Sequence, residues 1–493
     1  MNHRARQKPL LNYASLKNTS VFLILSLVTL FIRLPFFFRD YIDRDESTFI
    51  LLGQSWVDGN LPYSVLWDLK PPLTFAFFAL IISIFGKSFI AIRLFGALLV
   101  IVTAFFTYKI GLRISTKKVS FWASLLCVAL LSLFGSVQGV MSEHICMAFF
   151  IPALYLIATK TNGYWFLIAG GLMGICLMTK LNMAYPALIL GLYLCYSLLK
   201  DKKTNSLWKV FMYLLGILII ISLTILPYYL KGESLLWWNS VIMAPLEYIE
   251  ARRYSITKLA PSFILIGSLI FLAWKKEIIS FKNKTTLLLV LSITGVMLSF
   301  LKGGRINGHY LIQVYPMLAL IFVLLVKHYI TIYRPKIPKA LFLLLLLAPV
   351  ESYLEYINII KNKLEQGTFY NGEGFSIPRY IMENNLETKN IFFLGYHIGY
   401  WPLDKLPPSK AATHPSNIYR DELYPFYNTS RKNSMDELRY IMEELQPKTI
   451  VIRKNKRIFD KKEIEENEYI EAYLKKHYKV SANVENATIL QRL

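Results

Sequence analysis

Long apolar runs separated by short polar loops constrain this chain more than any other feature. A helix needs about 20 apolar residues to cross a hydrocarbon core of about 30 Å. Of the 493 residues, 55% are hydrophobic and only 18% are charged, which excludes a soluble globular protein. Apolar runs that are long enough, or nearly long enough, to cross the membrane lie near residues 20–38, 88–110, 119–137, 142–159, 163–180, 183–199, 208–230, 259–274, 285–302, 309–327 and 338–350. We therefore predict a mainly α-helical, polytopic transmembrane bundle over residues 1–350.

The run 72–86 is too short to be counted with the others. At about 1.5 Å per residue it would rise only about 22 Å, and it begins at Pro71-Pro72. We expect a short helix that enters the outer leaflet without fully crossing. Counting it as a crossing would place Arg113, Lys117 and Lys118 outside, against the preference of basic loops for the cytoplasm.

Basic loops orient the remaining spans. With about eleven crossings (range about ten to thirteen), the N-terminus is cytoplasmic and the C-terminal part is extracytoplasmic. The net charge of +23 is then explained by loops that meet anionic lipid, so the bilayer is a partner and nucleic acid is not. The predicted cytoplasmic basic segments are the N-terminus, 109–118, Lys160, 200–203, 275–284 and 327–339.

This topology gathers the unusual ionisable residues at the outer face, where they indicate an outward-opening cavity. They lie in the first outer loop 39–71, at Arg93, Glu143, His144 and Lys180, and in the segments 231–258 and 302–310. Residues 351–493 differ in character, because short β-like runs (391–394, 449–453) alternate with polar helical stretches (434–445, 461–477). They predict a small extracytoplasmic α/β domain.

Two adjacent acids of the first outer loop are candidate catalytic residues. Asp45 and Glu46 point about 100° apart on a helix, so only one needs to face a cavity. A carboxylate there could accept a proton from a hydroxyl or hold a divalent cation; whether a metal is required stays open. The alternative is a solvated loop whose acids have no chemical role, and this is our expectation for Asp40 and Asp43.

Three basic residues are candidate phosphate ligands. Lys70 precedes two prolines and would lie at a helix start, where unpaired backbone N–H groups favour anions. Arg93 and Arg305 offer the bidentate donors that suit phosphate. The alternatives are a lysine that snorkels to the headgroups and an arginine paired with Glu143 or with an acid of the loop.

The remaining candidates would line the substrate cavity. Glu143 and His144 begin a span at the outer face, where an acid can also serve only to cap the helix. His309 and Tyr310 lie on a glycine-rich turn that allows close backbone approach to a ligand. That turn can also be purely structural, and a single histidine is more often a structural residue than a ligand.

An ordered set of short motifs resembles a known family. The set is D-R-D-E-S at Asp43, G-N-L-P-Y, W-D-L-K-P-P-L, F-G-K-S and A-I-R-L-F-G, followed by S-E-H at Ser142, G-L-M-G-I-C-L-M-T-K-L-N at Gly171 and G-R-I-N-G-H-Y at Gly304. It is similar to polyprenyl-phosphate-dependent glycosyltransferases of the GT-C fold. The likeness is greatest to dolichyl-phosphate-mannose-protein mannosyltransferases and their bacterial aminoarabinose-transferase-like relatives.

The resemblance implies roles for matching positions. Asp45, in the acidic pair with Glu46, would be the base, Lys70 would hold the donor phosphate, and Arg93, Glu143 and His309-Tyr310 would match the family's other outer-face positions. Some relatives have an acid directly before the lysine; here Leu69 stands there and Asp68 one position earlier, which puts a metal in doubt.

The implied activity is transfer of a hexosyl or pentosyl group, with inversion, from a polyprenyl phosphate to a hydroxyl of a protein, lipid or glycan. A bacterial inner membrane is the implied location. The competing hypotheses are a lipid-linked sugar flippase or transporter with an outward-facing cavity, and a membrane scaffold whose outer domain binds a partner. A membrane ligase or polymerase of O-antigen would carry different motifs.

Overall fold

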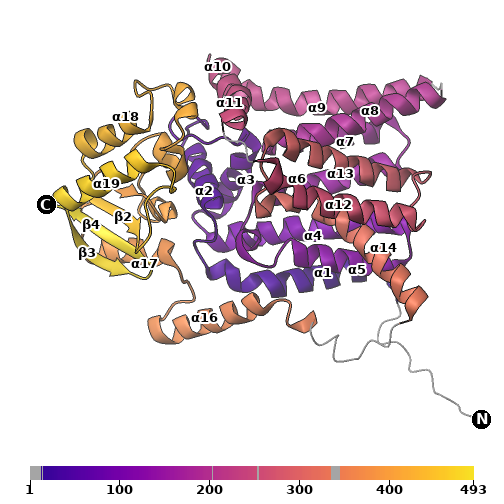
Figure 1. Cartoon of the computed structure of the whole chain (residues 1–493), viewed down its shortest axis with the longest axis horizontal. Helices are drawn as coiled ribbons and strands as arrows, with labels where there is room; N and C mark the ends of the chain where they lie inside the picture. The colour runs from indigo at the N-terminus through magenta and orange to yellow at the C-terminus, as the bar shows by residue number, and fades with distance from the viewer. Residues whose placement is uncertain (1–12, 14, 202–203, 252–254, 335–344) are drawn as a thin grey trace, which may run out of the picture.

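The computed structural model describes residue 13 and residues 15–201, 204–251, 255–334 and 345–493. A bundle of roughly parallel helices forms one part of the molecule, and the C-terminal segment packs against one end of it (Figure 1). The basic N-terminal residues 1–12 and most of the last predicted span, 338–350, lie outside the described residues.

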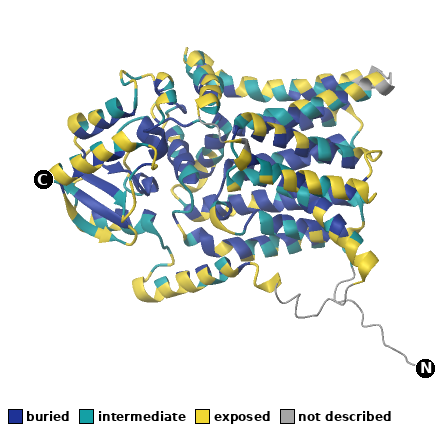
Figure 2. Ribbon diagram, in the orientation of Figure 1, coloured by how far each residue is buried: buried dark blue, intermediate teal, exposed yellow. Residues whose placement is uncertain are grey.

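Within the described residues, seven helical segments are long and apolar enough to cross a membrane, which confirms the predicted helical bundle. They are α1 with the 3-10 turn after it (Asn18–Phe38), α4 (Phe89–Ile114), α6 (Ser142–Thr159), α9 (Thr204–Leu230), α12 (Ile256–Lys275), α13 (Lys284–Gly303) and α14 (Tyr315–Tyr333). Shorter apolar helices are α3 (Pro72–Phe85), α7 (Gly163–Thr179) and α8 (Ala184–Asp201). Exposed residues are frequent along α9 and α12, as expected of lipid-facing helices (Figure 2).

Glycines allow α7 and α9 to pack with their backbones almost in contact. A Cβ added at Gly170 would lie 2.0 Å from the carbonyl oxygen of Tyr213, and one at Gly216 would lie 2.3 Å from that of Leu167. Small residues at such a crossing replace the hydrophobic driving force that a bilayer does not supply.

The predicted span 119–137 is shorter than expected. The helix α5 (Lys117–Leu130) ends early, and the chain continues as a loop with a 3-10 turn at Gly135–Gln138. The buried guanidinium of Arg33, on α1, donates to the carbonyl oxygens of Leu131, Val137, Gln138 and Gly139. These four bonds satisfy backbone acceptors that a helix would otherwise have to pair, so the loop is stable inside the bundle.

Residues 39–86 form two helices at the end of the bundle that faces the C-terminal segment (Figure 1). Asp43 begins α2 (Arg44–Val57), because its side chain accepts a hydrogen bond from the N–H of Asp45. Pro72 occupies the first turn of α3, where a missing N–H costs nothing. The 14 residues of α3 measure about 21 Å in length.

The C-terminal segment contains a four-stranded sheet of order β1-β2-β4-β3. β1 (Phe392–Phe393) is parallel to β2 (Thr449–Arg453), and β4 (Ala487–Arg492) pairs antiparallel with β2 and with β3 (Tyr478–Val484). The helices are α16 (Val350–Gln366), α17 (Glu373–Glu383), α18 (Ser434–Arg439) and α19 (Ile464–His477). Strands and helices thus occur where the sequence predicted them, and β3, β4, α16 and α17 are additional.

Candidate functional site

A cavity of about 350 Å³ lies where the bundle meets the C-terminal segment. Its walls come from the first turn of α2, the loop before α3, the α7–α8 junction, the helix α11 (Ala244–Ala251), the end of α13 and the C-terminal segment. The polar lining residues used below are Asp45, Asp68, Lys70, Lys180, Tyr248, Arg305, His309, Tyr310, His414 and Arg420. Pro245, Leu246, Ile249 and Phe300 make part of the wall apolar.

Asp45 is the acid of the predicted pair that faces this cavity. Its Oδ2 lies 3.4 Å from Nζ of Lys70, and its Oδ1 lies 3.5 Å from Nε2 of His414. The side chain keeps 26% of its surface exposed. Burial alone would raise the pKa of Asp45, but the Lys70 ammonium and the contact with His414 outweigh it and hold that pKa well below its usual range.

Lys70 is held in place by contacts on both sides. Its carbonyl oxygen accepts from the hydroxyl of Tyr63 at 2.6 Å, and its N–H donates to Asp68 at 3.2 Å. The ammonium lies 5.7 Å from the centre of the Phe49 ring. Burial disfavours the ammonium, but Asp45 and further neighbours outweigh burial and raise the pKa of Lys70, so it remains a cation.

Glu46 and Arg93 point away from the cavity and pair with each other. Their side chains lie 2.6 Å apart, and each is about 1% exposed. The N–H of Val140 also donates to Glu46, at 2.7 Å. Neither residue is part of the cavity lining, so the pair matches the structural alternative, an arginine bound to an acid of the loop.

Glu143 is buried directly behind the lining. It forms an ion pair with Lys180, and its Oε1 lies 3.8 Å from Nε2 of His309. Lys180 and His309 themselves face the cavity. Glu143 therefore touches the cavity only through these two side chains, and it balances the charge of Lys180.

His144 lies away from the cavity and supports the neighbouring loop. The N–H of Met141 donates to its Nδ1 at 3.2 Å, so Nε2 carries the proton and donates to the carbonyl oxygen of Leu131 at 2.9 Å. Arg33 binds the same carbonyl oxygen. The histidine thus shares the structural role of Arg33.

Arg305 and Tyr310 face the cavity as predicted. Gly304 ends α13 in the left-handed conformation (φ +62°), and this turn leads the chain into the cavity wall. Arg305 donates to the hydroxyl of Tyr248, and its guanidinium carbon lies 4.8 Å from the centre of the Tyr248 ring. Lys180 lies 3.9 Å from the centre of the Tyr310 ring.

Asp40 and Asp43 are not the solvated loop acids that we expected. Asp43 caps α2 and accepts a hydrogen bond from Ser136. Asp40 is 1% exposed and lies beneath Gly372, where a Cβ would meet its Oδ1 at 2.2 Å. Burial, with Glu373 close by, raises the pKa of Asp40 well above its usual range.

Sequence reasoning missed the part of the site that comes from far along the chain. Arg420 stacks over the same Tyr248 ring as Arg305, at 4.9 Å, and His414 contacts Asp45. Both residues lie in the C-terminal segment, and no motif marks them. Lys180 carried a signal, because it stands in the segment that begins at Gly171 and was predicted to lie at the outer face.

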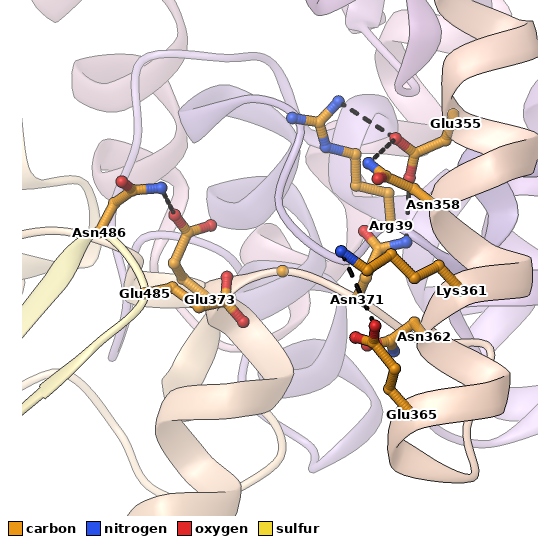
Figure 3. Close-up of a pocket in the computed structure, with 11 residues that line it drawn as sticks. Arg39, Glu355, Asn358, Lys361, Asn362, Glu365, Asn371, Glu373, Glu485 and Asn486 are labelled. Carbon is orange, nitrogen blue, oxygen red and sulfur yellow. Dashed lines mark hydrogen bonds and ion pairs between the residues drawn. The ribbon is translucent and has the colours of Figure 1, made fainter.

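A second, more open cavity of about 310 Å³ lies between α16, the start of α17 and the β3–β4 turn (Figure 3). Two ion pairs join lining residues, Arg39 with Glu355 at 3.9 Å and Lys361 with Glu365 at 3.8 Å, and Asn486 donates to Glu373 at 2.9 Å. It contains none of the predicted site residues. Among the described residues, no group of three or more His, Cys, Asp or Glu side chains is arranged to hold a metal ion.

Comparison with known proteins agrees with the predicted resemblance. Residues 69–228 match the family model of dolichyl-phosphate-mannose-protein mannosyltransferase, and this range includes Lys70, Arg93, Glu143 and Lys180. No protein of the curated set matches the chain.

Two solved structures of ArnT from Cupriavidus metallidurans share the fold over almost the whole chain. The apo structure is matched with a TM-score of 0.54 and 11% identity, covering 96% of this chain and 98% of that one. The structure bound to undecaprenyl phosphate is matched with a TM-score of 0.54 and 13% identity, covering 97% of each chain. The chain thus has the GT-C fold of ArnT, and its residues 69–228 resemble the dolichyl-phosphate-mannose-protein mannosyltransferase family.

Proposed function

We propose that this protein is a membrane glycosyltransferase that moves a sugar from a polyprenyl phosphate to an acceptor hydroxyl. The observation that carries the proposal is one cavity in which an acid, Asp45, pairs with Lys70, with Lys180, Arg305 and Arg420 on the same walls. Cationic groups suit a phosphate, and an apolar wall at the end of a membrane bundle suits a lipid-linked donor. The ArnT structure with bound undecaprenyl phosphate supports this choice of donor.

The reaction is a single displacement at the anomeric carbon. The acceptor oxygen bonds to that carbon while the bond from the carbon to the phosphate oxygen breaks, so the configuration inverts. The acceptor proton passes to Asp45, and the polyprenyl phosphate leaves with the electron pair. Lys70 stabilises the negative charge that grows on this phosphate.

Lys70 also links donor binding to the strength of the base. Without donor, its ammonium holds the pKa of Asp45 low and makes the carboxylate a poor proton acceptor. A donor phosphate beside Lys70 offsets that charge, so the pKa of Asp45 rises toward its ordinary value. Asp45 is then a better base when the donor is in place than when it is absent.

The proposed orientation places the cavity outside the membrane. The N-terminus is cytoplasmic, the C-terminal domain 351–493 is extracytoplasmic, and the site opens at the outer face of a bacterial inner membrane. This orientation is supported by the basic loops and by the position of α2, α3 and α11 at the bundle end next to the C-terminal segment (Figure 1). The acceptor is a hydroxyl of a protein, a lipid or a glycan, and the sugar is a hexose or a pentose.

The test is transfer by the purified protein in lipid nanodiscs, with a panel of undecaprenyl-phosphate sugars and extracted envelope acceptors. We expect Asp45→Asn to lower the rate about 10²- to 10⁴-fold. Asp58→Asn is the matched control, because Asp58 caps the other end of α2, its side chain accepts from Gln54, and it is outside the cavity lining.

Transfer undiminished by Asp45→Asn would remove Asp45 as the base. If no donor supports transfer, the proposal fails, and movement of intact lipid-linked sugar across the bilayer would instead identify a flippase or transporter.

A further inference from the structure

A histidine of the C-terminal segment reaches the proposed base. His414 Nε2 lies 3.5 Å from Oδ1 of Asp45, whereas Lys70 approaches the other carboxylate oxygen, Oδ2. The His414 side chain is only 8% exposed. The two residues are separated by most of the chain, so the contact exists only when the C-terminal segment is seated on the bundle.

Hydrogen bonds determine which ring nitrogen of His414 carries the proton. The N–H of Ser416 donates to Nδ1 at 3.1 Å, and the Ser416 hydroxyl lies 2.7 Å from the same atom. A nitrogen that accepts from a backbone N–H holds no proton, so in the neutral ring the proton is on Nε2. That N–H is on the ring atom that lies 3.5 Å from Oδ1 of Asp45, so the carboxylate is the acceptor within its reach.

The backbone that carries His414 is fixed to the loop that carries Lys70. The N–H of Trp67 donates to Oγ1 of Thr413 at 3.3 Å, and the indole N–H of Trp67 donates to Ser240 at 3.0 Å. Trp67 is fully buried. His414 is therefore held in register with the loop from Trp67 to Lys70.

A second histidine contacts the same face of α2. Nε2 of His397 lies 2.9 Å from the hydroxyl of Thr48, one turn after Asp45 on α2, and its ring centre is 5.7 Å from that of His414. The charged and titratable groups around His414 are Asp45, Asp68, Lys70 and His397, with Arg44, His309 and Arg420 beyond them.

We propose that His414 is a positioning residue for the reaction: its Nε2–H holds Oδ1 of Asp45, so that the base keeps one orientation while Lys70 turns to the donor phosphate. The inference depends on the proposed function, because it assigns the C-terminal segment a part in that same site. When the phosphate draws Lys70 away from Asp45, His414 is the contact that still orients the carboxylate. The C-terminal segment thus orients the carboxylate of Asp45 in addition to forming part of the cavity wall.

The experiment compares two amides that imitate different nitrogens of the ring. His414→Asn keeps an acceptor near the position of Nδ1 for Ser416 but cannot reach Asp45. His414→Gln places an amide N–H near the position of Nε2 and can donate to Asp45. His477→Asn is the control, because His477 lies in the same segment, stacks on Tyr473 and is outside the cavity.

We expect His414→Asn to lower kcat about ten- to a hundredfold, with the KM for donor changed less than about twofold. The acidic limb of its pH–rate profile should move to higher pH, because Asp45 loses a contact that favours its ionised form. His414→Gln should restore most of kcat and return the limb toward that of the wild type. Wild-type kcat in His414→Asn, or equal losses in both variants with an unmoved limb, would overturn the inference.

An infrared titration separates this inference from the proposed function. The carboxylate band of Asp45 is assigned by its absence in Asp45→Asn, and its pH midpoint can be followed without any substrate. We expect a higher midpoint in His414→Asn than in the wild type, and a nearly unchanged one in His414→Gln. Equal midpoints in all three proteins would overturn the proposed role of the contact between His414 and Asp45, even if transfer is observed. A shifted midpoint in a protein that transfers no sugar would contradict the proposed function alone.

Discussion

Two ion pairs begin from adjacent residues of α2 and have opposite surroundings. Asp45 and Lys70 lie 3.4 Å apart with 26% and 19% of their side chains exposed, on the wall of a cavity. Glu46 and Arg93 lie 2.6 Å apart, each about 1% exposed, inside the bundle. The partly exposed pair of Asp45 and Lys70 can exchange one partner for a substrate. The buried pair of Glu46 and Arg93 cannot.

The difference follows from the geometry of one helix turn. Successive residues on a helix point about 100° apart, so only one of two adjacent acids can face the cavity. Glu46 packs against the loop at Gly139, where a Cβ would meet its Oε2 at 3.0 Å. A sequence motif therefore cannot identify a catalytic acid by itself, because the side chain must also point into the cavity.

The largest effect on stability should come from breaking the buried pair. Arg93→Met leaves the Glu46 carboxylate buried without its cation, which costs about 3–5 kcal/mol of unfolding free energy. Thermal unfolding in detergent measures this cost. Glu46→Gln combined with Arg93→Met should recover much of it, because no buried charge is then left alone. If Arg93→Met unfolds like the wild type and only loses transfer, the arginine contacts substrate after all.

Breaking the cavity pair should affect transfer and spare the fold. Lys70→Met removes the cation that we propose to face the departing phosphate, so we expect a loss of about 10²- to 10³-fold in kcat. The unfolding free energy should change by less than about 1 kcal/mol, because the pair is partly solvated. Lys282→Met, at an exposed loop lysine outside the cavity, serves as the control. A large loss of stability with unchanged kcat would reverse the roles assigned to the two pairs.

The helical bundle was predictable from the sequence because the length of an apolar run is a local property. The same holds for the strand Thr449–Arg453, whose predicted bounds equal the observed ones. The early end of α5 was not predictable, since Arg33 causes it from another helix. Lys70 and Asp45 could be named from motifs, whereas His414 and Arg420 enter the site only through the docking of the C-terminal segment.

A third acid of the same loop extends the comparison, because it is buried like Glu46 but has no cation at ion-pair distance among the described residues. Asp40 is 1% exposed, and among the described residues it forms no ion pair within 4.0 Å. Burial, followed by the charge of Glu373, raises the pKa of Asp40 well above its usual range. An acid whose folded-state pKa is raised opposes folding once it ionises, so its cost is absent below the unfolded pKa of about 3.9 and complete above the folded pKa.

Asp40→Asn removes that cost while keeping the shape of the neutral acid. We expect the variant to unfold like the wild type near pH 4 and to be more stable by roughly 1–2 kcal/mol at pH 8. Unfolding followed at both pH values measures the difference, and Asp404→Asn is the control, since Asp404 is a largely exposed acid paired with Lys87. A variant that is less stable than the wild type at pH 8 would show that Asp40 is ionised and bound to a group that favours its charge. In that case burial alone would not distinguish the acids of this loop, and the presence of a cation would no longer explain why Glu46 is tolerated in the core.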